Sequence, residues 1–391
     1  MEPFWESKHW ELKDYHLQQM AKMPFQRSFP FIPTKSGLYI IRGPRQVGKS
    51  TWLKTILSHF VKNKKNCFYI TCENISDNKE LSEMLNLISD KELILLDEIS
   101  FVKNWDRSIK KFMDEGYNGI IAITGSHAYD LKNGADRMPG RFGNGGEFTL
   151  LPLGFNEFQK ARVDAKWSTG DRVKELEAYF RVGGFPAAIK EGGKKANIPI
   201  KAFTDFWRWI AGDAVKNNKK ELFLKEIISI VAKTQCDPMS FQTLAQKTSI
   251  GSHNTIIDYI EFLESCFALK ILLPIDASTG HYQFKKNKKI YFRDPFLYWL
   301  ALQKSGFKWA HLNIEDHYPI IAELVAHEQL MRTEEDFGYI NNSNGEIDFV
   351  KPKEWAIEVK WSSIVHNLSK TYTHYIVPHK KIWYKGNFLE K

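Results

Sequence analysis

A glycine-rich motif constrains the fold of this chain more than any other feature. Residues 43–50 read Gly-Pro-Arg-Gln-Val-Gly-Lys-Ser and match the pattern GxxxxGK[ST]. The apolar run 38–41 before the motif predicts a buried strand, and residues 51–57 after it predict a helix. In this strand–loop–helix context the pattern forms a phosphate-binding loop. The motif therefore predicts that the chain binds a nucleoside triphosphate.

Each part of the motif has a defined chemical role. The glycines let the backbone wrap closely around phosphate oxygens, and the loop N–H groups and the helix N-terminus attract an anion. We expect Lys49 to reach the β- and γ-phosphates and the Ser50 hydroxyl to hold Mg²⁺, so the predicted cofactors are ATP and Mg²⁺. The candidate nucleotide-binding residues are Gly43, Pro44, Arg45, Gln46, Val47, Gly48, Lys49, Ser50 and Thr51.

A second strand signal brings two carboxylates to the same site. Residues 93–96 are apolar and are followed by Asp97 and Glu98, while residues 67–71 predict another strand. The carboxyl ends of parallel strands meet at one edge of a sheet, beside the phosphate loop. We expect Asp97 to hold Mg²⁺ together with Ser50, and Glu98 to polarise the attacking water.

A further apolar strand, residues 119–126, ends in hydroxyl groups. Thr124 and Ser126 are candidates for sensing the γ-phosphate, and a helix cap or turn at this point is the alternative for each hydroxyl. The alternation of strands with helical stretches predicts a doubly wound α/β fold.

The Gly/Pro-rich segment 138–143 carries an arginine that could stabilise charge on a neighbouring subunit's γ-phosphate. Arg141 is the first candidate and Arg137 the second. The alternative is an arginine that pairs with a nearby carboxylate.

The composition bounds the class of protein. The 391 residues suffice for two or three domains, and the net charge of +9 favours a polyanionic partner, although lysine-rich surfaces are often only solvated. No apolar run approaches the length of a membrane span, and the N-terminus does not resemble a signal peptide. The four cysteines form no CxxC pair, which predicts buried thiols in a cytoplasmic protein.

Six segments together resemble a widespread prokaryotic family of AAA+-like P-loop ATPases. They are GPRQVGKS (43–50), LLDEIS (95–100), ITGS (123–126), DRMPGRFG (136–143), LLPLGFNEF (150–158) and VGGFP (182–186). The resemblance implies ATP hydrolysis, with contacts between identical subunits or with DNA as possible uses. It also implies a C-terminal companion that resembles a winged helix followed by a PD-(D/E)xK nuclease-like domain. We expect Phe155, Phe158 and residues 183–184 to have structural roles, packing a lid under the core.

The middle of the chain predicts helices followed by a hairpin. The helical runs are 222–234, 240–246 and 252–263, and the strand runs are 268–273 and 289–292. The third helix begins with uncharged polar residues and continues with acidic ones, so sequence-specific reading of DNA is poorly supported. The hairpin segment 285–289 supplies four lysines that could contact the phosphate backbone of duplex or branched DNA. A protein partner remains the alternative.

The C-terminal third predicts a hairpin around residues 343–345 and then a strand, 355–360. Asp348 and Glu358-x-Lys360 form the D-x9-ExK pattern of PD-(D/E)xK nucleases, in which two carboxylates hold Mg²⁺ and the lysine orients water. Glu323 or Glu328 could complete such a site from a preceding helix. Three interpretations stay open: a nuclease, a non-catalytic fold that binds DNA or a partner, and a misread pair of ordinary strands.

These signals divide the chain into an ATPase core (1–160), lid or linker helices (161–200), a winged helix (201–295) and a nuclease-like domain (296–391). The leading prediction is an ATPase that couples its nucleotide state to DNA binding or remodelling. The alternatives are an ATP-controlled switch that assembles with a protein partner and an ATP-gated nuclease.

Overall fold

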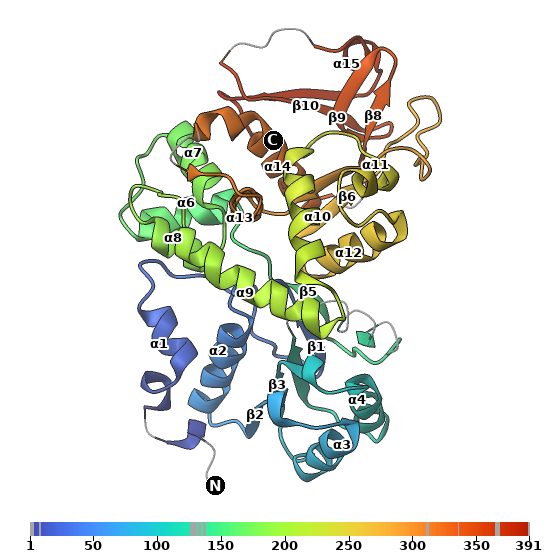
Figure 1. Cartoon of the computed structure of the whole chain (residues 1–391). Coiled ribbons are helices and arrows are strands. Elements are labelled where there is room, and N and C mark those ends of the chain that lie inside the picture. The colour runs from blue at the N-terminus through green and yellow to red at the C-terminus, as the bar shows by residue number, and fades with distance from the viewer. Residues whose placement is uncertain are drawn as a thin grey trace. The chain divides into compact units, whose positions relative to one another are not determined.

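The chain folds into two compact units in a computed structural model (Figure 1). The first is Met1–Pro152 and the second is Leu153–Lys391. The structure describes residues 4–7, 9–125, 131, 134–135, 138–309, 313–334, 336–363 and 368–389.

A parallel sheet forms the centre of the first unit. Its described strands lie in the order β2-β3-β4-β1-β5, and each neighbouring pair is parallel. The strands are β1 (Gly37–Arg42), β2 (Cys67–Thr71), β3 (Leu93–Asp97), β4 (Ile120–Thr124) and β5 (Gly146–Thr149). The helices whose bounds lie fully within the described residues are α1 (Tyr15–Ala21), α2 (Lys49–Lys62), α3 (Asn78–Leu87) and α4 (Trp105–Asp114). The strands predicted around 38–41, 67–71, 93–98 and 119–126 are confirmed, with shorter ends for the last two.

The apolar strands of this sheet are covered on both faces. Alternate residues such as Ile94 and Ile121 pack in one cluster with Leu85 of α3 and Ile109 of α4. Residues of α2 contact β2, β3 and β4, and Trp52 is fully buried. Side chains alternate between the faces of a strand, so a strand buried on both sides must be apolar throughout. The predicted α/β class with a parallel-sheet core is confirmed.

In its described residues, the second unit combines helices with two small sheets. Its helices are α6 (Phe155–Asp164), α7 (Arg172–Val182), α8 (Pro186–Gly192), α9 (Ile200–Lys216), α10 (Glu221–Lys233), α11 (Phe241–Gln246), α12 (His253–Ser265), α13 (Pro295–Lys304), α14 (Tyr318–Met331) and α15 (Lys370–His374). Its strands are β6 (Leu269–Leu272), β7 (Lys289–Phe292), β8 (Gly338–Asn342), β9 (Gly345–Lys351), β10 (Trp355–Lys360) and β11 (His379–Tyr384). β6 and β7 form an antiparallel pair. The other sheet has the order β11-β10-β9-β8, in which only β10 and β11 are parallel.

The predicted helices and strands between residues 222 and 292 occur as α10, α11, α12, β6 and β7. Ser240 accepts a hydrogen bond from the Thr243 N–H at 2.9 Å and caps α11. Ser252 caps α12 through the Thr255 N–H. The assignment of this segment as a winged helix stays a prediction, as does the finer division of the chain after residue 160.

The segment around α6 and α7 belongs to the second unit. Phe155 and Phe158 are buried, and their rings lie 5.9 and 5.1 Å from the Tyr179 ring of α7. The compact first unit therefore ends at Pro152, before the predicted boundary at 160.

Gly183 and Gly184 also have a structural role. Gly183 ends α7 with a φ of 74°, and a Cβ there would lie 2.0 Å from an Asp294 carboxylate oxygen. The Gly184 N–H donates to the other Asp294 oxygen at 2.9 Å. Burial raises the pKa of this carboxyl to about 7. The two glycines therefore allow the backbone to approach a buried side chain that caps α13.

Candidate nucleotide site and C-terminal acidic cluster

The glycine-rich loop joins β1 to α2 with an unusual backbone. Gly48 and Gln46 have φ values of 98° and 63°. Gly43 has a φ of 148°, and a Cβ there would lie 2.0 Å from the Leu150 carbonyl oxygen. This close approach explains why the motif requires glycine at its first position.

Lys49 is the first residue of α2 and is buried. Its ammonium donates to the carbonyl oxygens of Gly43 at 2.9 Å and Pro44 at 2.8 Å. The positive charge is therefore held directly over the loop, where the sequence predicts phosphate oxygens.

Asp97, at the carboxyl end of β3, accepts hydrogen bonds from three hydroxyl groups. The Ser50 hydroxyl donates to its Oδ1 at 3.1 Å, and the Tyr69 hydroxyl donates to Oδ2 at 2.9 Å. The Thr124 hydroxyl also donates to Oδ1. Burial and the Asp97 charge raise the pKa of Tyr69, so this phenol remains a donor. Ser50 and Asp97 thus place two oxygens side by side, as a shared Mg²⁺ would require.

Glu98 follows Asp97 outside the strand. It adopts a left-handed conformation with a φ of 54°, is partly buried, and donates its backbone N–H to the Thr124 hydroxyl at 3.2 Å. Thr124 lies at the end of β4, which pairs with β1 as expected. Its hydroxyl bridges Asp97 and Glu98 within the protein. Ser126 lies outside the described residues.

Arg141 pairs with a carboxylate of its own unit. Its guanidinium donates to the two Asp114 oxygens at 2.9 and 3.3 Å. The next residue, Phe142, accepts a hydrogen bond from the Leu38 N–H at the start of β1. Arg141 therefore lies at the opposite sheet edge from the glycine-rich loop, about 15–20 Å away along a six-residue strand. The alternative of a local ion pair is present in the structure, and Arg137 lies outside the described residues.

Two residues that the sequence analysis did not identify also support the loop. The Arg27 guanidinium donates to the carbonyl oxygens of Val47 and Leu151. Phe29 stacks on Trp52 of α2, with ring centroids 5.9 Å apart and planes 6° apart. No motif marks these residues, because their partners lie far along the chain.

The C-terminal acidic cluster comprises Glu323, Glu346, Asp348 and Glu358. The first residue comes from α14, the next two share one face of β9, and the last lies on β10. The Lys360 ammonium lies 2.8 Å from Glu358, so the expectation that these two side chains share a face is confirmed. The Val359 N–H donates to Asp348 at 2.8 Å.

Lys289 of β7 lies inside this cluster. Its fully buried ammonium is 2.9 Å from Glu323, 2.5 Å from Glu346 and 3.8 Å from Asp348. Burial disfavours the charged ammonium, but these carboxylates outweigh that effect and raise the pKa of Lys289 well above its usual range. The expectation that Lys289 supplies an exposed cation for phosphate is therefore wrong, because long-range ion pairs bury it.

The two helix glutamates have different surroundings. Glu323 also accepts a hydrogen bond from the Tyr291 hydroxyl at 2.6 Å, within the acidic cluster. Glu328 instead pairs with Arg293 at 3.0 Å and Arg332 at 3.4 Å. Glu323 is thus the helix glutamate that contacts Lys289 together with Asp348. Among the described residues, no group of three or more His, Cys, Asp or Glu is arranged to hold a metal ion.

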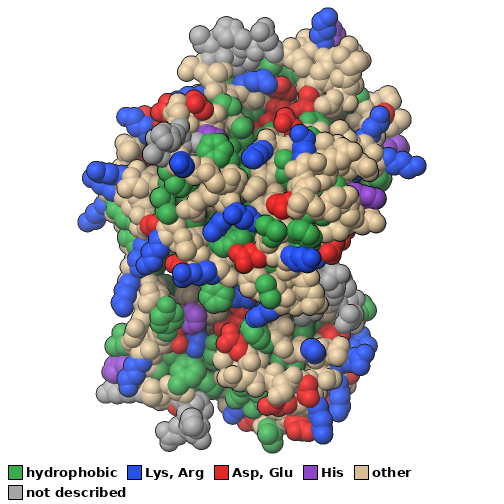
Figure 2. All heavy atoms as spheres, in the orientation of Figure 1, with side chains coloured by type: hydrophobic (Ala, Val, Ile, Leu, Met, Phe, Trp, Pro, Cys, Tyr) green, Lys and Arg blue, Asp and Glu red, His purple; other side chains and the backbone are tan. Residues whose placement is uncertain are grey.

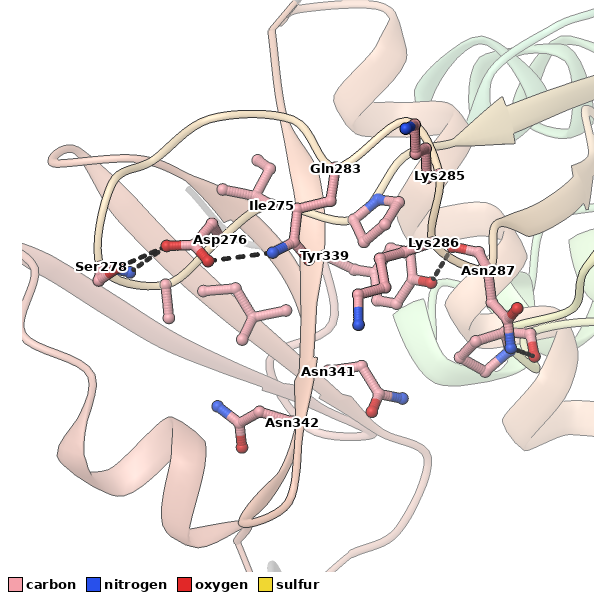
Figure 3. A pocket seen from close by; sticks show the side chains of 14 residues that line it. Ile275, Asp276, Ser278, Gln283, Lys285, Lys286, Asn287, Tyr339, Asn341 and Asn342 are labelled. Atoms are coloured by element: carbon pink, nitrogen blue, oxygen red, sulfur yellow. Dashed lines mark hydrogen bonds between the residues drawn. The ribbon is translucent and has the colours of Figure 1, made fainter.

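A polar pocket of about 650 Å³ lies between the loop before β7 and strand β8 (Figure 3). Lys285, Lys286 and Asn287 line one side, and Asn341 and Asn342 line the other. Lys286 points toward the side formed by β8 in Figure 3. The Asn341 amide also donates to Glu346 at 2.9 Å, so the pocket borders the acidic cluster. The lining of the pocket therefore combines the exposed lysines 285 and 286 with the amide groups of Asn341 and Asn342.

Positive charge is not gathered in a single stripe on the face shown in Figure 2, where lysine and arginine side chains alternate with acidic ones.

All four cysteines are free thiols. Cys67 and Cys72 are buried, whereas Cys236 and Cys266 are only partly buried, which corrects the expectation for two of them. In the part of the chain that the structure describes, no helix is long and apolar enough to cross a membrane.

Comparison with known proteins supports the assignment of the first unit. Residues 35–159 match the AAA domain family, and residues 173–308 match a domain of unknown function, DUF8612. The parallel sheet with its glycine-rich loop is a P-loop NTPase core, and its described strands β1 to β5 lie within the residues that match the AAA domain model. The AAA match spans both the glycine-rich loop and Asp97.

Two similar sequences come from Methanocaldococcus jannaschii. Uncharacterized protein MJ1544 is 29% identical over 65% of this chain and 60% of its own length. Uncharacterized protein MJ1637 is 24% identical over 72% of this chain and 70% of its own length. Among solved structures, the Walker-type ATPase paby2304 of Pyrococcus abyssi has a TM-score of 0.46 at 14% identity, covering 75% of this chain and 95% of that one.

Proposed function

We propose that this chain binds and hydrolyses ATP with Mg²⁺ and that its nucleotide state controls contact with DNA. The observation that carries the ATPase part is the position of Asp97. It accepts the Ser50 hydroxyl beside a loop whose carbonyl oxygens already hold the Lys49 ammonium. A cation and a phosphate group would thus meet ligands that lie together in the fold.

The residues of the first unit divide the chemistry among them. Lys49 exchanges the carbonyls of Gly43 and Pro44 for phosphate oxygens, and the loop N–H groups bind the same phosphates. Ser50 and Asp97 would hold Mg²⁺, and the bound ion would supply positive charge next to the phosphates. Glu98 orients the attacking water, and Thr124 holds the backbone of Glu98 in place.

The Lys49→Ala variant is expected to bind ATP about 10- to 100-fold more weakly than the wild type, because it loses charge-assisted hydrogen bonds to phosphate. Calorimetric titration with a non-hydrolysable ATP analogue and Mg²⁺ measures this loss. Lys62→Ala is the matched control, since Lys62 lies on the same helix and is largely exposed. Equal affinities for Lys49→Ala and the wild type would overturn the nucleotide assignment.

A homo-oligomer in which Arg141 acts on a neighbouring subunit is part of this proposal. It lies at the sheet edge opposite its own glycine-rich loop, so it could reach only the γ-phosphate of a neighbouring subunit. Such a role requires the guanidinium to leave Asp114.

The DNA part of the proposal depends on the loop before β7. Lys285 and Lys286 are exposed there, whereas Lys289 is buried and Lys288 donates to the carbonyl oxygens of Phe284 and Lys286. Two exposed lysines next to a polar pocket favour contact with the phosphate backbone over reading of bases. A protein partner for the same helices and hairpin is the second candidate, because α12 carries acidic residues such as Asp258 and Glu261 that repel phosphate.

We expect the Lys285→Glu/Lys286→Glu variant to bind duplex DNA more than tenfold more weakly at low salt, and its plot of log affinity against log salt to be shallower by about 2. Fluorescence anisotropy with duplex and branched DNA, with and without ATP, measures both quantities. The pair Lys194→Glu/Lys195→Glu is the control, since these neighbouring lysines are also exposed in the second unit. An equal loss in the control, or no DNA binding by the wild type, would favour the protein partner.

A further inference from the structure

The carboxylates that the D-x9-ExK pattern predicts as metal ligands already surround a cation of the protein itself. Lys289 lies 2.9 Å from Glu323 and 3.8 Å from Asp348. It comes from β7 of the two-stranded sheet, whereas the carboxylates come from α14 and from the four-stranded sheet. The contact is therefore made between separate elements of the second unit.

The ammonium is enclosed by these partners. Lys289 has no exposed surface, and Glu346 approaches its Nζ to 2.5 Å. A buried ammonium with three carboxylate neighbours has the satisfied geometry that a buried charge requires. A divalent cation at the same carboxylates would lie next to this ammonium, and the two positive charges would repel each other in a poorly solvated site.

A second observation shows that the lysines leave part of this cluster unsatisfied. The Glu358 side chain is 5% exposed, and its Oε1 pairs with Lys360. Its Oε2 is buried and has no hydrogen-bond partner among the described residues. The cluster holds four carboxylates, Glu323, Glu346, Asp348 and Glu358, against the two ammonium groups of Lys289 and Lys360. Removal of Lys289 would therefore leave several carboxylate oxygens without a cation, and such oxygens are the ligands that a hard cation prefers.

We infer that Lys289 takes the place of a divalent metal ion in the acidic cluster, so that the cluster binds such an ion only when Lys289 is removed. The wild-type C-terminal sheet then lacks the metal that the D-x9-ExK pattern implies, and metal-dependent cleavage of DNA does not occur at this site. The lysine also joins β7 to β9 and α14, because its ion pairs reach both.

Removal of the ammonium tests this inference directly. The variants Lys289→Met and Lys289→Gln keep most of the side-chain length and delete the charge. Titration with Mn²⁺ in the absence of nucleotide, followed by electron paramagnetic resonance and thermal melting, should show one bound ion and a higher melting temperature for at least one variant. The wild type and the neighbouring control Lys288→Met should show neither change.

A double variant locates the ion. Lys289→Met/Asp348→Asn should lose the Mn²⁺-dependent rise in melting temperature, since it lacks one of the proposed ligands. If loss of the lysine destabilises the fold, the change in melting temperature on adding Mn²⁺ still tests the inference, because a bound ion stabilises the folded variant. The inference is overturned if Mn²⁺ stabilises neither single variant, or if the wild type binds Mn²⁺ in a way that Asp348→Asn abolishes. No nucleotide is present, so the outcome does not depend on ATP hydrolysis by the first unit.

Discussion

The Glu98→Gln variant is expected to bind ATP as tightly as the wild type. Its rate of ATP hydrolysis is expected to fall by about 100-fold or more. Glutamine retains the size of the side chain but cannot polarise water as a carboxylate does, and general-base catalysis typically contributes 10²- to 10⁴-fold. Asp97, Ser50 and Lys49 are untouched, so the binding contacts should persist. Calorimetric ATP titration and single-turnover phosphate release measure the two effects separately.

Glu92→Gln provides the matched control for this change. Glu92 precedes the same strand at its other end, where it pairs with Lys65 at 2.8 Å, far from the glycine-rich loop. Its substitution should leave both ATP binding and turnover unchanged. A fully active Glu98→Gln enzyme would contradict the assignment of Glu98 as the general base. A loss of ATP binding would instead mean that Glu98 contributes to nucleotide binding at the glycine-rich loop.

The Gly183→Ala variant is expected to lose about 3 kcal/mol or more of its free energy of unfolding. The added Cβ would lie 2.0 Å from Asp294 Oδ1 and 2.7 Å from the Phe296 nitrogen, at a φ of 74°. Relief of this clash would displace the carboxylate that accepts hydrogen bonds from the N–H groups of Gly184 and Phe296. Loss of a buried hydrogen-bond network is among the few changes that destabilise so strongly. Urea unfolding measures the loss.

Gly170→Ala separates the clash from the backbone strain. Gly170 has a φ of 76°, nearly that of Gly183, but a Cβ there would meet nothing within 4 Å. This control should lose only about 1–2 kcal/mol, the usual penalty for a left-handed residue with a side chain. Similar losses in the free energy of unfolding for the two variants would contradict this prediction. They would show that the Asp294 side chain moves away from the added methyl group without a large loss of stability.

Much of the first unit could be predicted because its signals are local. The glycine pattern at 43–50 lies within eight consecutive residues, and strands such as β3 and β4 are apolar up to their last residue because both faces are covered. The caps at Ser240 and Ser252 are equally local, since each serine accepts from an N–H three residues away. Helix and strand propensities and the spacing of apolar residues depend on neighbours only a few residues away, so they can be read from a single sequence.

The candidate sites depended more on contacts between distant segments. Asp97 could be predicted beside Ser50, but its hydrogen bonds with Tyr69 and Thr124 require the register of β2, β3 and β4. The pairing of Arg141 with Asp114 was foreseen only as an alternative. The choice between Glu323 and Glu328 required the position of α14 against β7.

Lys289 marks the boundary between what the sequence by itself determined and what only the tertiary structure decided. Residue types and spacing determined an ATP-type phosphate loop, a parallel sheet with Asp97 at its edge, and the shared face of Glu358 and Lys360. The same reasoning placed Lys289 among exposed lysines, because a lysine in a charged run is usually solvated. The tertiary fold buries it among carboxylates from α14 and β9, more than thirty residues away. Electrostatic partners at that distance leave no periodic signal in the sequence, so only the folded chain shows which charges neutralise one another.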